Sequence, residues 1–414
     1  FCVQAIVGYA DNLLPHLLSV SGNKRILIDK LKINTTVPDI KSSLHSSIFL
    51  QYSTLSRTKY TTMNNENFVR GEPVDVQEEF GVIDKGNGHY IGKKPLIKPI
   101  HYAPGAYGGS LAGQAVLVAM KSVPPEFKPH SLHSFFVRAA TTDIPVEWQV
   151  DNISSGKSFC NRAVKGMQRG KIVYFANISL TKKNSYKESY AKWEEESAKF
   201  HQRGKDGDVE ENEDDEDDDE PRAPSEPFRF QTPIHEWIKK YGEESLTVSP
   251  CESNMLSYFK FCPDFIDLDK SSYELDTPIA ERRFAFLVRW GIDNEQGYNQ
   301  PLKNVDEQFQ FVGLANISDA LILNVLERVL RLRGVPIKDN MKRFFGVSLD
   351  HVLYIHDNDF DVTKWMTYAF KTIRFSHDRV LYEGELYNHN GVHVASIVQE
   401  GLVRLAGAEQ NAKL

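Results

Sequence analysis

Apolar residues recur at helical spacing in the first half of the chain, between Gly108 and Lys121. Small residues open this stretch and apolar residues follow, so the pattern predicts a buried helix. Strand-like stretches come next, at residues 133–138, 144–150, 159–168 and 171–180. The turn Gln168-Arg169-Gly170 between the last two is a hairpin signal. We therefore predict one long helix followed by an antiparallel meander.

The second half of the chain repeats this order of elements. Apolar residues between Ser318 and Arg331 are spaced for an amphipathic helix, and Ser318 or Asp319 is suited to cap its start. Strands are predicted after it at residues 347–355, 366–375, 379–388 and 392–404. The last two are joined by a turn, Asn388-His389-Asn390-Gly391. The chain thus contains the same supersecondary unit twice.

Spacing within the two halves also agrees. His133 lies 29 residues before Arg162, and His351 lies 28 residues before Arg379. A repeated helix and meander is the pattern of two hotdog units, in which an antiparallel sheet wraps a long helix. Pairing of the two sheets edge to edge would cover strand edges that otherwise invite aggregation. We expect an α+β double hotdog with a cleft between its halves, and a shared structural role for Arg162 and Arg379.

An acidic run separates the two halves. Residues 206–220 contain 12 acidic side chains and no basic one, which is typical of a solvated, disordered linker; contact with a basic partner is the alternative. The first Met is Met63, and we assign no function to the residues around and before it. We divide the chain into five parts. They are a poorly ordered N-terminal extension (1–70), the first hotdog unit (71–200), the acidic linker (201–227), the second hotdog unit (228–409) and a C-terminal tail (410–414).

Composition is that of a soluble, globular protein. The chain has 414 residues, of which 41% are hydrophobic, enough for two ordinary domains. The formal net charge is -7, and the acidic run contributes -12, so the remainder carries +5, which suits an anionic ligand. The four cysteines form no CxxC pair, which indicates neither a zinc site nor a disulfide framework and favours a reducing compartment. Asp11, Pro15 and His16 interrupt the mildly apolar opening stretch, so we expect no membrane span.

Several motifs occur in the same order as in a known family. The first half contains YGGSLAGQA, LHSFFVR and GKSFCNRAV, and the second contains ANISDALIL, SLDHVLYIH and GVHVASIVQEGLVR. With these motifs the chain resembles the acyl-CoA thioesterase II family, which includes peroxisomal acyl-CoA thioesterases. The resemblance implies a double-hotdog fold and hydrolysis of fatty acyl-CoA to fatty acid and CoA, without a metal or other cofactor. We expect acyl-CoA as the ligand and no nucleic-acid partner, and assembly into a homo-oligomer stays open.

The family's Asp, Ser/Thr and Gln triad falls on Asp319, Ser348 and Gln399. The resemblance implies that Asp319 takes a proton from water while Ser348 and Gln399 hold that water. Each residue also has a plainer interpretation: a helix cap for Asp319, an ordinary strand serine for Ser348, and an amide paired with backbone for Gln399. The sequence has no GxSxG motif, so a serine nucleophile is not supported. Extra residues at 331–343 and the segment 371–379 depart from the family pattern and leave acyl-chain preference open.

Further residues are candidates for contact with the substrate. Gly108 and Gly109 precede the first helix and either present backbone N–H groups to an anion or carbonyl or allow close packing. Lys157 is a candidate for the CoA phosphates, as are Lys93 and Lys94.

The chain ends in Ala412, Lys413 and Leu414, a small-basic-Leu tripeptide of the type read by the peroxisomal import receptor. We therefore expect residence in the peroxisomal matrix. Two other functions remain as alternatives: an enoyl-CoA hydratase of the hotdog type, and a non-catalytic double hotdog that binds acyl-CoA. The Asp-x4-His spacing associated with hydratase chemistry occurs only at Asp11/His16 and at Asp84/His89, outside the predicted hotdog helices.

Overall fold

The computed structural model places its described residues in one compact unit. These residues are 68–69, 71–99, 103–206, 220–225, 240, 242–248, 254–293, 299–320, 323, 325–332 and 345–405. Nearly all of the expected N-terminal extension, most of the acidic linker and the C-terminal tripeptide lie outside them.

The first half contains the helix that its sequence pattern predicts. Helix α5 spans Gly108–Lys121, and 12 of its residues are buried. The other elements, in chain order, are β1 (Val74–Asp75), α4 (Val76–Glu79), β2 (Val82–Gly86), β3 (His89–Gly92), β4 (Lys128–Phe136), β5 (Glu147–Ser155), β6 (Phe159–Gln168), β7 (Lys171–Thr181) and α6 (Tyr186–Asp206). Helix α6 continues six residues into the segment that we predicted to be disordered linker, so that boundary was placed too early.

The second half has the same core elements with more strands at its outer edge. Its main helix is α9 (Glu307–Ser318), and a short helix α10 (Leu326–Val329) follows. The remaining elements are η2 (Glu243–Ser245), β8 (Thr247–Val248), β9 (Ser257–Phe261), α8 (Pro263–Ile266), η3 (Ser272–Asp276), η4 (Ile279–Glu281), β10 (Arg283–Trp290), β11 (Leu302–Lys303), β12 (Phe345–Ser348), β13 (Asp350–Ile355), β14 (Met366–Ser376), β15 (Arg379–Tyr387) and β16 (His393–Arg404).

Strands β5, β6 and β7 form a meander, but β4 does not continue it. Strand β4 pairs with β7 on one side and with β13 of the other half on the opposite side. The second half does the same, because β13 pairs with β16. The predicted simple meander is therefore wrong for the first strand of each half. A ten-residue connection, 137–146, separates β4 from β5 and is too long for a hairpin.

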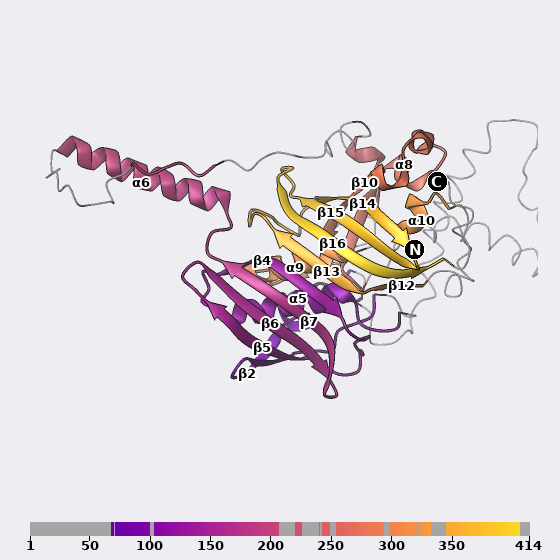
Figure 1. The fold of residues 1–414 in the computed structure, drawn as a ribbon, viewed down its shortest axis with the longest axis horizontal. Coiled ribbons are helices and arrows are strands. Elements are labelled where there is room, and N and C mark those ends of the chain that lie inside the picture. The colour runs from indigo at the N-terminus through magenta and orange to yellow at the C-terminus, as the bar shows by residue number, and fades with distance from the viewer. Residues whose placement is uncertain are drawn as a thin grey trace, which may run out of the picture. The chain divides into compact units, whose positions relative to one another are not determined.

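The two halves form one continuous antiparallel sheet. Its order is β2-β3-β5-β6-β7-β4-β13-β16-β15-β14-β10-β9-β8, and β12 pairs with β16 beside β13. The predicted pairing of two half-sheets edge to edge is thus confirmed, between Ser131–Tyr354 and Phe135–Asp350. Helices α5 and α9 pack against each other on one face of this sheet (Figure 1). The fold is the expected double hotdog.

The main helix of the second half lies before the segment predicted for it. Asp306 caps α9 by accepting a hydrogen bond from the Phe309 N–H at 3.1 Å, and the helix ends at Ser318. Asp319 is therefore the C-cap residue, not an N-cap. Helix α9 has no amphipathic pattern because it packs against both α5 and the sheet. Burial on nearly every side removes the polar stripe that such a prediction needs.

Strand boundaries in the second half differ at one place that matters. The single strand predicted over 347–355 is interrupted at Leu349, which separates β12 from β13. The Leu349 N–H donates to the Glu400 carbonyl at 2.9 Å, and its own carbonyl accepts from the Phe136 N–H at 3.0 Å. This break lies directly after Ser348.

Candidate active site

Asp319, Ser348 and Gln399 come together from three separate elements. The Gln399 Nε2 donates to the Asp319 Oδ1 at 2.6 Å and to the Ser348 Oγ at 2.7 Å. The Ser348 hydroxyl donates to the same Asp319 oxygen at 3.2 Å. Gln399 is fully buried and Asp319 is 9% exposed. The three side chains form one closed hydrogen-bonded set at the inner face of the sheet.

Local structure explains how these side chains meet. Gln399 occupies an inward-facing position of β16, where buried and half-buried residues alternate. Ser348 is the last residue of β12 and pairs with Gly401 of β16, two residues after Gln399. Ser348 and Gln399 therefore lie close together along β16. Asp319 projects from the C-terminal end of α9. None of these neighbours is close in sequence, because 29 residues separate Asp319 from Ser348 and 51 separate Ser348 from Gln399.

The turn that carries Asp319 is held by its neighbour Ser318. The Tyr368 hydroxyl donates to the Ser318 carbonyl at 2.8 Å, and the Ser318 hydroxyl donates to the Ala315 carbonyl at 2.9 Å. The His351 Nε2 lies 3.1 Å from the same Ser318 oxygen. Because the hydroxyl hydrogen is already used, the imidazole is the donor there. Sequence analysis missed Tyr368 and assigned no role to His351.

His351 itself is fully buried. Burial lowers the pKa of its imidazole to about 4, so the ring is neutral at pH 7. Its Nδ1 has no hydrogen-bond partner among the residues that the structure describes. This histidine therefore supports Asp319 through Ser318, whereas the carboxylate itself is hydrogen-bonded by Gln399, Ser348 and Gly109.

The first half contributes the glycine end of α5 to this site. A Cβ at Gly108 would lie 2.7 Å from the Asp319 Oδ2 and 2.7 Å from the Phe136 ring, so any other residue would displace one of these side chains. A Cβ at Gly109 would lie 2.4 Å from the Asn316 carbonyl oxygen. The backbone N–H of Gly109 hydrogen-bonds the Asp319 carboxylate. Close packing of the helices and donation by the helix start, which we weighed as alternatives, therefore occur together here.

Burial dominates the electrostatics of Asp319. Loss of water raises the pKa of this carboxyl from 3.8 to about 6, although the hydrogen bonds from Gln399, Ser348 and the Gly109 N–H act in the opposite direction. The carboxylate is therefore ionised above about pH 6 but holds a proton more tightly than an exposed aspartate. Such a pKa lies close to that of an effective general base at neutral pH.

One buried acceptor at the site is unused. The Gln399 Oε1 has no hydrogen-bond partner in the part of the chain that the structure describes, whereas its Nε2 makes two bonds. An unpaired amide oxygen in a buried place is costly unless a donor reaches it. A water molecule or a polar hydrogen of a ligand would satisfy it.

The structure does not bring Lys157 to this site. Phe159, two residues later, pairs with Thr181 of β7, whereas Phe136 beside the site pairs with Tyr174 of the same strand. Seven residues of strand correspond to roughly 23 Å, so Lys157 lies toward the other end of the sheet. Two further lysines considered for the CoA phosphates are engaged in ion pairs, Lys93 with Glu78 and Lys94 with Glu79.

The expected common role of Arg162 and Arg379 is wrong. Arg162 is buried at 4% exposure and donates to Asn152, Ser122 and Ser155. The Arg379 side chain is 55% exposed and forms one ion pair, with Glu400 at 3.4 Å. The two arginines have nearly equal spacing from a histidine in the sequence, but one side chain is buried and the other is exposed.

The first half has no glutamine at the position that Gln399 occupies in the second half. Arg162 is the fourth residue of β6 and pairs with Ile178, and Tyr382 is the fourth residue of β15 and pairs with Gln399. The place of Gln399 is thus taken by Ile178 in the first half, which offers no hydrogen-bonding group.

The hydratase spacing has no counterpart at this site. Asp84 lies on β2 and His89 on the adjacent strand β3, so neither residue belongs to α5 or α9. Asp11 and His16 lie outside the described residues. Within the described ranges, no group of three or more His, Cys, Asp or Glu side chains is arranged to hold a metal ion. The helices described are also too short or too polar to cross a membrane.

Each half of the chain matches a family model of known proteins. A model of the acyl-CoA thioesterase N-terminal domain matches residues 98–181, and a model of the acyl-CoA thioesterase C-terminal domain matches residues 299–403. The chain is 24% identical over 331 residues to the peroxisomal acyl-coenzyme A thioester hydrolase 1 of Saccharomyces cerevisiae, covering 75% of this chain and 88% of that protein.

A human relative and a solved structure match a similar share of this chain. Human acyl-coenzyme A thioesterase 8 is 27% identical over 331 residues, which cover 77% of this chain and 88% of that protein. The tesB protein of Mycobacterium avium subspecies paratuberculosis has a similar fold, with a TM-score of 0.51, 16% identity, and coverage of 79% of this chain and 97% of that chain. Together with the order and pairing of its two hotdog units, these matches show that the chain belongs to the acyl-CoA thioesterase II family.

Proposed function

We propose that this acyl-CoA thioesterase hydrolyses fatty acyl-CoA with a water molecule activated by Asp319, Ser348 and Gln399. The observation that carries the proposal is the buried carboxylate of Asp319, hydrogen-bonded by Gln399 and Ser348 beside an amide oxygen that lacks a partner. This arrangement supplies a base, two groups that fix its orientation, and a free acceptor for water.

In the proposed step, water attacks the thioester carbonyl carbon and its proton passes to Asp319. The Gln399 Oε1 accepts the second hydrogen of the water, which directs a lone pair of the water oxygen toward the carbonyl. The carbonyl oxygen becomes an oxyanion in the tetrahedral intermediate. The first N–H groups of α5, including that of Gly108, lie at the positive end of the helix dipole and suit a negative charge.

Collapse of the intermediate breaks the carbon–sulfur bond and gives the carboxylic acid and CoA. A thiol, for which the cysteine reference pKa is about 8.5, leaves readily as a thiolate, so no strong acid is needed. The proton held by Asp319 passes to the thiolate or to bulk water, which returns the carboxylate to its starting state. No serine nucleophile is needed, and Ser348 serves as a hydrogen-bonding partner.

Release of free thiol from acyl-CoA, followed with a thiol dye over short, medium and long chains, tests the activity. Asp319→Asn and Gln399→Ala should abolish turnover while CoA binding, measured by calorimetry, survives. Addition of water to enoyl-CoA without thiol release would favour the hydratase alternative. Binding of acyl-CoA without either reaction would favour the non-catalytic one.

A single-turnover reaction in ¹⁸O-labelled water tests the mechanism separately. Direct attack by water places the label in the fatty acid during the first turnover. An unlabelled fatty acid together with labelled Asp319 would instead show that Asp319 forms an acyl anhydride.

Peroxisomal residence is a further part of the proposal. Its support is the name of the yeast relative, a peroxisomal thioester hydrolase matched over 88% of its length. The tripeptide Ala412-Lys413-Leu414, expected to bind the import receptor, lies outside the described residues. Removing these three residues from a tagged protein should leave it in the cytosol. Unchanged import would mean that another signal operates.

A further inference from the structure

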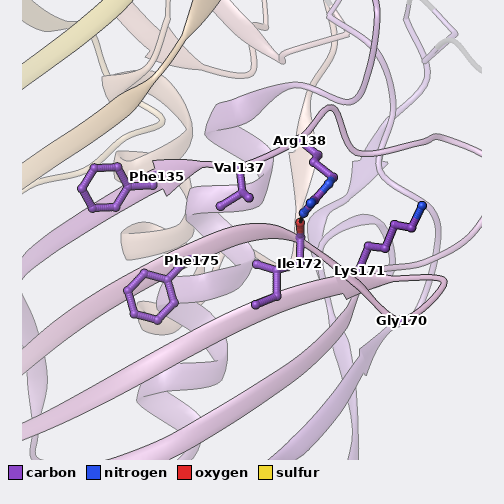
Figure 2. Close-up of a pocket in the computed structure, with 7 residues that line it drawn as sticks. All are labelled: Phe135, Val137, Arg138, Gly170, Lys171, Ile172 and Phe175. Carbon is purple, nitrogen blue, oxygen red and sulfur yellow. Dashed lines mark hydrogen bonds between the residues drawn. The ribbon is translucent and has the colours of Figure 1, made fainter.

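A pocket of about 530 Å³ lies on the outer face of the first-half sheet, opposite the face that α5 covers. Apolar side chains from β4 and β7 form part of its lining, and basic side chains form another part (Figure 2). The lining residues are Phe135, Val137, Arg138, Gly170, Lys171, Ile172 and Phe175. Figure 2 shows the rings of Phe135 and Phe175 at one side and the charged ends of Arg138 and Lys171 at the other.

The two cations of this pocket have no acidic partner within the described residues, unlike several neighbours. Arg169 is paired with Asp143, and Lys165 with Asp151. Arg138 donates from Nη1 to the Ile172 carbonyl at 2.7 Å, which fixes the guanidinium beside the pocket and leaves further N–H groups for a ligand. A fixed guanidinium and an adjacent ammonium over an apolar surface suit an anion that also carries an aromatic or apolar part.

Large apolar side chains are exposed here. Phe135 is 55% exposed and Val137 is 45% exposed. An aromatic ring at the surface offers a face on which a nucleobase stacks, and such stacking depends little on the identity of the base. Arg138 and Lys171 supply charge for phosphates at the same place. The lining therefore matches both chemical parts of a nucleotide.

The pocket adjoins the strand position that leads to the active site. Phe135 faces outward, whereas the next residue, Phe136, faces inward and contacts the space beside Gly108 and Asp319. The ladder between the two halves also ends here, because Val137 and Arg138 donate to the Val173 carbonyl instead of to the second half.

Distances along the backbone are short. Phe135 pairs with Asp350, which is two residues from Ser348. Paired residues lie about 5 Å apart and two strand residues span about 7 Å, so the backbone of Ser348 lies on the order of 10 Å from that of Phe135. The pocket and the Asp319 carboxylate lie on opposite faces of the sheet, so the pantetheine arm of CoA would cross between them where the ladder of the two halves ends, beyond Phe136.

We propose that this pocket, lined by Phe135, Phe175, Arg138 and Lys171, binds the phosphorylated adenosine end of the CoA moiety while the thioester lies at Asp319. The inference rests on the proposed function and gives it a nucleotide subsite. It replaces Lys157 as the contact for CoA phosphates.

The test compares two substrates with the same acyl chain. One is the acyl-CoA, and the other is the acyl thioester of N-acetylcysteamine, which lacks the nucleotide. In the double variant Arg138→Gln/Lys171→Gln, KM for acyl-CoA should rise at least about tenfold with kcat little changed, since two charge-assisted contacts are lost. KM for the nucleotide-free thioester should not rise.

Two further variants serve as controls. Arg138→Lys/Lys171→Arg keeps both charges and should retain most of the affinity for acyl-CoA. Arg169→Gln removes a nearby cation that lies outside the pocket, and it should leave KM for acyl-CoA within about twofold of the wild type, because a solvated charge contributes little.

Several outcomes would overturn the inference. One is an unchanged KM for acyl-CoA in the double glutamine variant. Another is an equal rise of KM for acyl-CoA and for the nucleotide-free thioester. A change in sedimentation with unchanged CoA affinity would mean that the surface joins two copies of the chain. If the wild type releases no thiol, the proposed function fails, and calorimetric titration with CoA alone still decides whether Arg138 and Lys171 bind the nucleotide.

Discussion

Asp319 is unusual because the fold buries a carboxylate without a neighbouring cation among its hydrogen-bond partners. Its partners are an amide, a hydroxyl and a backbone N–H. These neutral donors offset only part of the desolvation, so the pKa of the carboxyl stays raised, at about 6. A guanidinium or ammonium in the same place would have lowered that pKa and weakened the base. The residue types around Asp319 therefore set its basicity.

The first prediction concerns the pH dependence of turnover. In the proposed mechanism water gives its proton to ionised Asp319, so kcat should rise with pH through an apparent pKa of about 6 and level off above pH 7. Stopped-flow or steady-state rates across pH 4.5 to 8.5, at saturating acyl-CoA, measure this profile. A flat profile through pH 6, with an intact fold by circular dichroism, would contradict the assignment of Asp319 as base.

The same raised pKa has a consequence for stability. A carboxyl whose pKa is higher folded than unfolded stabilises the fold below the unfolded value, near 3.8, and this contribution is lost as pH rises through about 6. Asp319→Asn should therefore stabilise the protein at pH 7.5, by about 3 kcal/mol at most. Thermal melting at pH 7.5 and at pH 4.5 measures the effect, which should be smaller at the lower pH. A lower melting temperature of this variant at pH 7.5 would count against a desolvated, ionised Asp319.

A third prediction ranks the two partners of Asp319. The Gln399 bond at 2.6 Å is shorter than the Ser348 bond at 3.2 Å, and both lower the pKa of the carboxyl. Gln399→Ala should therefore shift the pKa of Asp319, measured by NMR titration of its labelled carboxyl carbon, upward by more than Ser348→Ala does. If neither side chain interacts with the carboxylate, neither replacement will move that pKa. An order reversed between the two variants would contradict the hydrogen-bond geometry.

At the scale of elements, the site depends on how the end of α9 meets the start of α5. The C-terminal turn of α9 is held through Ser318 by Tyr368 and His351, and the start of α5 lacks side chains at Gly108 and Gly109. The carboxylate of Asp319 fits between them because a glycine backbone can approach it closely.

Gly108→Ala tests this fit. A Cβ there would lie 2.7 Å from both the Asp319 carboxylate and the Phe136 ring, so one of them must move. We expect a loss of kcat of about a hundredfold, since small displacements of a positioned group have large effects, and a destabilisation of about 1–3 kcal/mol. Gly156→Ala, whose Cβ would meet only the Phe159 carbonyl at 3.2 Å, is the control for glycine replacement. Equal and small effects in both variants would show that Asp319 tolerates displacement.

At the scale of the whole molecule, the two hotdog units share one sheet and one helix interface. Strands β4 and β13 pair through five rungs, and Gly113 of α5 lies so close to Val312 of α9 that a Cβ would be 3.0 Å away. Separation of the halves would expose two strand edges and two buried helix faces at once. Neither half therefore has a complete core on its own.

This shared core predicts cooperative unfolding. Urea unfolding followed by tryptophan fluorescence and by far-ultraviolet circular dichroism should give coincident single transitions, because both halves lose their packing together. Loss of activity should follow the same curve, as the Gly109 N–H and Asp319 come from different halves. Two separated transitions would indicate that the halves are independent domains.

The sequence by itself determined the existence and order of the main elements. Glycine-ended turns and alternation located the β6–β7 and β15–β16 hairpins, and the run of small and apolar residues located α5 at its observed bounds. These signals are local, since turn geometry and burial periodicity act over a few residues. Family motifs then selected Asp319, Ser348 and Gln399 as a set, which no local pattern would have joined.

Only the tertiary structure decided the surroundings of Asp319, Ser348 and Gln399. Helix α9 was missed because it is buried on nearly every side, and the central place of β4 and β13 follows from pairing between the halves, which the chain order does not encode. The environment of Asp319 has the same origin: its burial, its contact with the Gly109 N–H and its raised pKa all require residues 80 or more positions away to lie within hydrogen-bonding distance. Long-range packing, which no local pattern of residues encodes, therefore set the chemistry of the site.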